Sequence, residues 1–168
     1  TDINDCRIAH FDDGKYTYTA LVNSYVRVGE SVLAGVNEVG FGCINTATRN
    51  LSRKPTKQGR RYSGKYSLSC RALRECATVD EFEQMLKRNV RSADFQTNIG
   101  VGDATGAAAY FEIWSDGYAR YDVDTYDVRT NCSFAGRDDK RGTSVRRYDT
   151  VRAQMEGKRS FAPADFFG

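Results

Sequence analysis

The sequence predicts an α+β fold, and three patterns carry that prediction. Runs of β-branched and aromatic residues come first, two helical stretches follow, and from Phe95 the apolar spacing changes to two before a last helix. No internal repeat or interdomain linker interrupts the 168 residues, a length that suits one domain with its own core. Such segregated runs favour layers in which antiparallel sheets and helices surround a common core.

The composition excludes several classes of partner. Hydrophobic residues make up 40% and charged residues 28% of the chain, as in ordinary globular proteins. A net charge of +3 is too small to indicate nucleic-acid binding. No segment reaches the roughly twenty apolar residues of a membrane-spanning helix. We therefore predict neither a nucleic-acid partner nor a membrane span.

The first strands surround a glycine-rich centre. We interpret Thr1–Asp13 as a polar segment and predict a strand within Lys15–Val26, with a hairpin turn at Arg27–Glu30. Two central strands follow, in Ser31–Val36 and Val39–Asn45. The stretch Arg49–Ser63 lacks periodicity and is predicted to be an exposed loop.

Helical spacing begins near Gly64 and continues to Asn89. Four apolar side chains share one face of the first helix: Tyr66, Leu68, Leu73 and Cys76. Thr78, with Glu81 three residues later, forms a capping box that predicts the start of a second helix.

The second half returns to strands. These are predicted at Phe95–Gly102, Ala107–Trp114, Tyr118–Val123 and Val128–Phe134, with turns at 103–106 and 115–117. A charged loop at 136–142 precedes a helix over Ser144–Met155.

The five cysteines and single histidine argue against a metal site. No Cys-x-x-Cys pair is present, so we predict no metal and no cofactor. The odd cysteine count suits buried thiols, and burial in an apolar strand would raise the pKa of Cys43. His10, in a polar segment, fits a surface residue better than a general base.

Four polar residues have two interpretations from composition alone. The amide of Asn45 is either satisfied inside the protein or aimed at a ligand, because a buried amide must use its donors and acceptors. Asn131 either begins a turn or serves a site. Of Arg146 and Arg147, either both are solvated or one is held for a purpose.

Several motifs in order resemble one branch of the N-terminal-nucleophile hydrolases. They are Gly35-Val-Asn-Glu-Val-Gly-Phe41 before a strand ending in Asn45, Gly102-Asp-Ala-Thr-Gly106 before Glu112, Thr130-Asn131, and Ser144-Val-Arg-Arg-Tyr148. The branch includes choloylglycine hydrolase, penicillin V acylase and the acyl-CoA:6-aminopenicillanate acyltransferases. The resemblance implies a four-layer αββα sandwich with two antiparallel sheets.

The resemblance also implies a chemistry and a set of residues. In this family an N-terminal cysteine attacks an amide and its own α-amine acts as the base, so no histidine is needed. By similarity, Asn45 and Asn131 serve the oxyanion site and substrate positioning, and Arg147 polarises the surroundings of the cysteine. Asp2 matches the aspartate that contacts the nucleophile's amine.

The family's cysteine precedes the segment that Asp2 matches. We therefore expect residues 1–168 to be a single domain truncated at both ends, with the nucleophile upstream. The expected substrate is a small-molecule N-acyl amide, and Tyr16, Tyr18, Phe41 and Phe134 are candidates for an acyl pocket or for the core. The alternative is a non-catalytic relative that binds a ligand or partner. A homo-oligomer and the compartment, bacterial cytoplasm or export, stay open.

Overall fold

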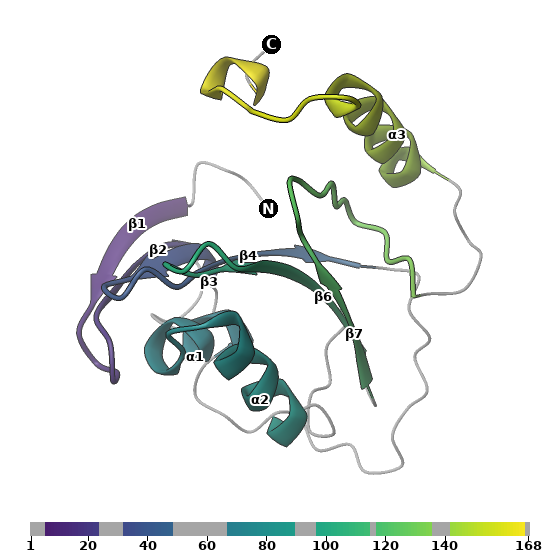
Figure 1. The fold of residues 1–168 in the computed structure, drawn as a ribbon. Coiled ribbons are helices and arrows are strands. Elements are labelled where there is room, and N and C mark those ends of the chain that lie inside the picture. The colour runs from purple at the N-terminus through teal and green to yellow at the C-terminus, as the bar shows by residue number, and fades with distance from the viewer. Residues whose placement is uncertain are drawn as a thin grey trace.

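A computed structural model describes residues 6–23, 32–48, 67–89, 97–114, 117–135 and 142–166. Seven strands form one antiparallel sheet in chain order, from β1 to β7 (Figure 1). The strands are β1 (Cys6–Phe11), β2 (Tyr18–Asn23), β3 (Val32–Asn37), β4 (Gly42–Ala47), β5 (Thr97–Gly102), β6 (Ala108–Trp114) and β7 (Gly117–Asp122). The helices are α1 (Leu68–Glu75), α2 (Val79–Asn89), α3 (Thr143–Met155) and a 3₁₀ turn at Pro163–Phe166.

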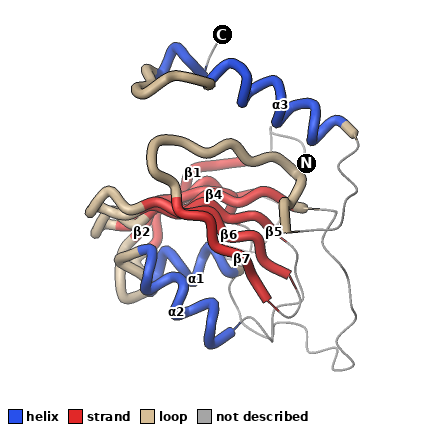
Figure 2. The backbone as a smooth tube through the Cα atoms, turned by 45° about the vertical axis from the view of Figure 1, so that its right-hand side comes forward, coloured by secondary structure: helices blue, strands red, loops and turns tan. Residues whose placement is uncertain are grey.

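The core lies between the sheet and the helices α1 and α2, which cover one face (Figure 2). Alternate strand residues point to this face because side chains alternate along a strand. The largest buried side chains there are Tyr18, Phe41, Leu73, Phe82, Met85 and Phe111. Tyr18 and Phe41 therefore belong to the core, which was one of the two roles considered for these aromatic residues.

Local signals for the helices are confirmed. Thr78 Oγ1 accepts the N–H of Glu81 at 3.1 Å, and Glu81 Oε2 accepts the N–H of Ala77 at 2.6 Å. The helix α2 starts and ends where the capping box and Asn89 predict. The turn at 103–106 is also confirmed, and Gly106 takes a positive φ of 90° there.

Two sequence predictions about strands are wrong. The segment interpreted as polar contains the strand β1. Residues Ile8 to Phe11 of this segment pair along their length with β2. The segment Val128–Phe134 is not a strand: its backbone makes only an isolated bridge between Thr130 and Cys132. Hydrogen bonds from side chains of the sheet, and not a strand ladder, fix the position of this segment.

The face of the sheet opposite α1 and α2, here called the open face, is apolar over β1–β4. Register places Ile8, Leu21, Val36 and Ile44 on it, and they are 76%, 38%, 50% and 54% exposed. The described residues form one sheet, so they do not include the paired sheets of a four-layer sandwich.

Some predicted features lie outside the described residues. They are Asp2, the turn at Arg27–Glu30, the loop at Arg49–Ser63, the start of the helical spacing at Gly64–Tyr66, most of the turn at 115–117 and most of the loop at 136–142. Among the helices that are described, none has the length and apolar character to cross a membrane.

Candidate functional site

The candidate site is built around residues 123–135, here called the crossing loop. This segment leaves β7 and runs across the open face on the side opposite α1 and α2 (Figure 2). Three polar side chains on neighbouring strands bind this loop. They lie side by side in the sheet register and are Thr46 on β4, Asn98 on β5 and Glu112 on β6. A polar row on an otherwise apolar sheet provides partners for a segment without a strand ladder.

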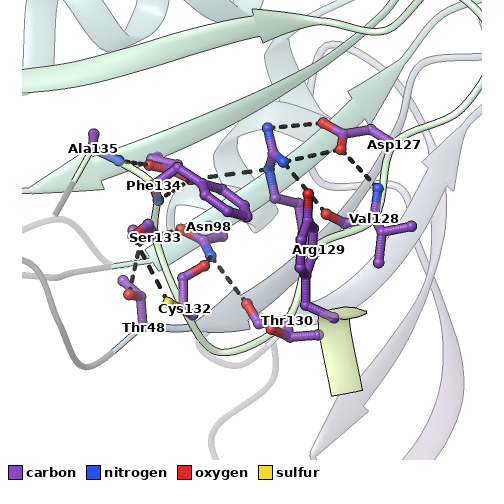
Figure 3. A network of polar contacts seen from close by, with 12 residues as sticks. Thr48, Asn98, Asp127, Val128, Arg129, Thr130, Cys132, Ser133, Phe134 and Ala135 are labelled. Atoms are coloured by element: carbon purple, nitrogen blue, oxygen red, sulfur yellow. Dashed lines mark hydrogen bonds and ion pairs between the residues drawn. The ribbon is translucent and has the colours of Figure 1, made fainter. Parts of the chain in front are cut away.

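Asn98 is fully buried and binds the middle of the crossing loop (Figure 3). Its Nδ2 donates to the carbonyl oxygens of Thr130 and Cys132, both at 3.1 Å. Its Oδ1 lies 2.6 Å from Ser133 Oγ, which is also 2.8 Å from Thr48 Oγ1. Both the Nδ2 and the Oδ1 of this amide have hydrogen-bond partners, so burying Asn98 leaves no polar atom unpaired.

Glu112 is fully buried and binds the end of the loop. Its two carboxylate oxygens accept the backbone N–H groups of Phe134 at 2.8 Å and Ala135 at 2.6 Å. Arg129 Nε lies 3.9 Å from Glu112 Oε1, too far for a hydrogen bond but close enough for an ion pair. A buried carboxylate needs such partners to offset its desolvation.

Arg129 is paired with a second carboxylate, that of Asp127 (Figure 3), and is surrounded by aromatic rings. Its guanidinium carbon lies 4.8–5.2 Å from the ring centres of Tyr110, Tyr121 and Phe134. Asp127 accepts from its Nη1 at 2.9 Å and pairs with its Nη2 at 2.8 Å. Burial raises the pKa of the Asp127 carboxyl, and the nearby guanidinium opposes that change.

Asn131 and Arg147 meet at the end of β4. Asn131 Nδ2 donates to the carbonyl oxygen of Ala47 at 2.8 Å, and its Oδ1 accepts from Arg147 Nη2 at 3.0 Å. The same guanidinium nitrogen donates to Ser144 Oγ at 3.3 Å. Thr130 Oγ1 donates to the Ser144 carbonyl at 2.9 Å, which joins the loop to the first turn of α3. Arg147 is thus held, although its side chain is exposed.

Asn45 does not join this pair. Its Nδ2 donates to Ser69 Oγ of α1 at 3.0 Å and to the carbonyl oxygen of Val32 at 3.2 Å, so it faces the helices. The next residue on β4, Thr46, faces the crossing loop and donates to Thr130 at 3.3 Å. The side chain of Asn45 therefore lies on the opposite side of the sheet from the loop, and both hydrogens of its Nδ2 are used within the protein.

Sequence reasoning missed Asn98, Glu112 and Arg129. A detectable signal was the polar residue in an otherwise apolar strand, as in Ala108-Ala-Tyr-Phe-Glu-Ile-Trp114. A carboxylate inside such a run is rarely buried without a partner. The partner could not be located from sequence, because it comes from a loop that we predicted as a strand.

The cysteines do not form a reactive centre within the described residues. Burial raises the pKa of Cys43 to about 12, as predicted, and that of Cys76 to about 12. Burial also raises the pKa of Cys70, whose thiol lies 3.2 Å from the Tyr18 hydroxyl. No disulfide joins the five cysteines, all of which are described. No group of His, Cys, Asp and Glu in the described segments is arranged to hold a metal ion.

A groove of about 610 Å³ lies on the open face beside the crossing loop. Its lining includes Gly42, Gly100, Gly102, Tyr110 and Asp127. The three glycines lie on the adjacent strands β4 and β5. Because they carry no side chain, they leave space at the bottom of the groove. The groove is largely apolar and can accommodate an apolar group.

Comparisons with known proteins find similarity in structure only. No protein-family model and no curated protein matches the chain. Penicillin V acylase from Agrobacterium tumefaciens matches with a TM-score of 0.50 and 20% identity over 65% of this chain and 33% of its own. Two variants of conjugated bile acid hydrolase from Clostridium perfringens match with a TM-score of 0.57 and 16% identity, over 92% of this chain and 62% of theirs.

The resemblance in fold is confirmed. At these identities the likeness concerns the fold alone, and the chain spans less than two thirds of each of these structures. The chain thus shares part of the fold of these solved structures.

Proposed function

We propose that this chain is part of an amidohydrolase or acyltransferase that cleaves an N-acyl amide with an N-terminal cysteine. The observation that carries the proposal is the hydrogen-bonded pair Asn131–Arg147, found on a fold shared with two hydrolases. The substrate class is a small-molecule N-acyl amide, as the names of the two structural neighbours suggest.

The pair suits the stabilisation of negative charge. Within the described residues, Asn131 Nδ2 uses one hydrogen on Ala47, and no hydrogen bond uses the other. That hydrogen can be donated to the oxyanion that forms when a thiolate attacks an amide carbonyl. Arg147 bonds to Asn131 Oδ1, which orients the amide and makes it a better donor.

The nucleophile is proposed to be a cysteine upstream of Thr1. The three cysteines on the helix-facing side have raised pKa values, which disfavours the thiolate needed for attack. In the proposed reaction the α-amine of the upstream cysteine takes the thiol proton and later gives it to the leaving amine. Water or an acceptor amine then releases the acyl group.

We also propose that a second sheet packs on the open face and completes the four layers. The exposed Ile8, Leu21, Val36 and Ile44 support this, since a large exposed apolar patch usually marks a covered surface. In this arrangement the groove and the Asn131–Arg147 pair lie between the two sheets.

The catalytic roles that the resemblance implies for Asp2 and Asn45 are also proposed here, and the role of Asn45 has the weaker support. Asp2 is proposed to contact the nucleophile's amine. Asn45 faces α1, so its contribution to catalysis would require a different side-chain direction from the one observed. Substitution of Asn45 is therefore a useful test of how far the family's residue roles carry over.

The proposal is tested on the full protein as its gene encodes it. Hydrolysis of penicillin V, a conjugated bile acid and simpler N-acyl amides is measured for the wild type, Asn131→Ala and Arg147→Ala. The matched control is Arg146→Ala, because Arg146 neighbours Arg147 and is equally exposed. We expect Arg147→Ala to lower kcat/KM by about a hundredfold and Arg146→Ala to leave it within about twofold.

Two outcomes would contradict the proposal. If both arginine variants keep full activity, the site is elsewhere on the molecule. If the full protein binds N-acyl amides without turnover and carries no N-terminal cysteine, the non-catalytic binding function is correct instead.

A further inference from the structure

The crossing loop depends on two buried side chains that the sequence motifs do not mark as part of the site. We propose that Asn98 and Glu112 are positioning residues, which hold the loop so that the Asn131 amide and the Arg147 guanidinium meet at the end of β4. The effect on catalysis rests on the proposed function, whereas the position of the loop does not.

The first step concerns the two residues that flank Asn131. The carbonyl oxygens of Thr130 and Cys132 both accept from the single nitrogen Asn98 Nδ2. Because one nitrogen binds the carbonyl groups of the residues before and after Asn131, a shift of the backbone at this residue would break at least one of these bonds. Thr46 adds a third bond to Thr130.

The second step concerns the exit of the loop. The N–H groups of Phe134 and Ala135 both donate to the Glu112 carboxylate, and Arg129 approaches it from the middle of the loop. Figure 3 shows these contacts arriving from two parts of the same short segment. Hydrogen bonds to a charged acceptor are stronger than neutral ones, so the Glu112 carboxylate fixes the exit of the loop. Its ion pair with Arg129 adds a contact to the middle of the loop.

The third step connects the anchor to the site. Asn131 bonds at once to β4 through Ala47 and to α3 through Arg147, at 2.8 and 3.0 Å. A displacement of about 1 Å takes both bonds out of range, and misplacements of that size can cost about a hundredfold in rate. Within the described residues, Glu112 and Asn98 make no hydrogen bond to Arg147 and do not line the groove, so we infer that they act through the loop.

Glu112→Gln is the informative variant. The glutamine keeps the shape but presents an NH₂ group to one of two backbone donors and removes the charge that faces Arg129. The matched control is Glu83→Gln. Glu83 is an ion-paired carboxylate that binds Tyr118 at 2.8 Å and Arg120 at 2.8 Å on the helix-facing side.

Two readouts are measured on the full protein. The first is the alkylation rate of Cys132, the buried cysteine of the crossing loop, followed by mass spectrometry of its peptide. The second is the separate effect on kcat and KM with the best N-acyl amide. Cys132 reports the position of the loop whether or not the protein is an enzyme.

We expect Glu112→Gln to raise the alkylation rate of Cys132 by about tenfold or more and to lower kcat by a similar factor, with KM changed less than about threefold. Glu83→Gln should lower thermal stability and change neither readout. Should Glu112→Gln not fold, the near-isosteric Asn98→Asp is used with the same outcomes. Slow hydrogen exchange of the Phe134 and Ala135 amides in the wild type is a further expected result.

The inference is overturned if the Cys132 rate and kcat of Glu112→Gln equal those of the wild type, or if both amides exchange rapidly in the wild type. A faster Cys132 reaction with unchanged kcat would retain the anchor but reject its catalytic role. Failure of the proposed function is a separate result, because it shows as an absence of turnover in the wild type.

Discussion

Asparagine side chains illustrate, at the scale of single residues, how hydrogen-bond partners decide a role. Asn37, in the motif that suggested the family, donates to the carbonyl oxygens of Leu73 at 3.0 Å and Cys76 at 2.8 Å. Its Oδ1 accepts the N–H of Phe41 at 2.9 Å. Asn37 therefore closes the turn after β3 and satisfies the end of α1, whereas one hydrogen of Asn131 Nδ2 has no acceptor among the described residues.

Asn37→Asp should destabilise the protein strongly. The substitution keeps the shape but removes both donors and places a carboxylate against two carbonyl oxygens. We expect the free energy of unfolding to fall by about 3 kcal/mol in urea titrations at neutral pH. The control is Glu38→Gln, an exposed neighbour whose oxygen still accepts the N–H of Thr17. Equal stability of the two variants would show that the Asn37 bonds contribute little.

At the scale of elements, the close packing of α1 on β3 depends on one missing side chain. A Cβ atom added at Gly35 would lie 2.6 Å from Leu73 Cδ1, 2.8 Å from the carbonyl oxygen of Thr19 and 2.9 Å from Ala20 Cβ. Real Cβ atoms do not approach so closely. The helix rests on the sheet at this point, and the signature glycine sets their separation.

Gly35→Ala should separate the helix from the sheet at a cost in stability. Overpacking of this kind lowers the free energy of unfolding by about 1–3 kcal/mol, which thermal unfolding measures. Gly102→Ala is the control, because a Cβ there meets only the Ala107 carbonyl oxygen at 3.6 Å. A loss for Gly102→Ala as large as that for Gly35→Ala would argue that strand flexibility, and not the contact with α1, is responsible.

At the scale of the whole molecule, the two faces of the sheet differ in how far they are covered. The face that packs against α1 and α2 is covered, and the open face is covered only in part. The helices α1 and α2 bury the first, and the crossing loop shields β5–β7 on the second. The apolar residues of β1–β4 on the open face stay accessible in the described structure. Their exposure is the physical basis for the proposed second sheet.

Ile44→Ser tests that arrangement in the full protein. If a second sheet covers the open face, the lost burial should lower the free energy of unfolding by about 1–2 kcal/mol. Val39→Ser is the control, since Val39 is 37% exposed in the turn between β3 and β4 and not on that face. Equally small losses for the two variants in chemical denaturation would mean that the open face of the full protein meets water.

Short-range patterns determined much of the fold. The capping box at Thr78 and Glu81, the strands β5 to β7 and the turn at 103–106 are confirmed, because each depends on residues within a few positions. Motif order also indicated the fold that the structural neighbours share. Of the candidate site residues that the motifs selected, the structure joins Asn131 and Arg147 by a hydrogen bond.

Only the tertiary structure decided which face each polar residue occupies. Asn45 bonds to α1 while Thr46, one position later, bonds to the crossing loop, and a strand pattern alone gives two equivalent faces. The segment predicted as the strand Val128–Phe134 became a loop because Asn98 and Glu112, more than twenty residues earlier, supply its hydrogen bonds. Contacts between distant segments form only once the sheet exists, so no local pattern records them.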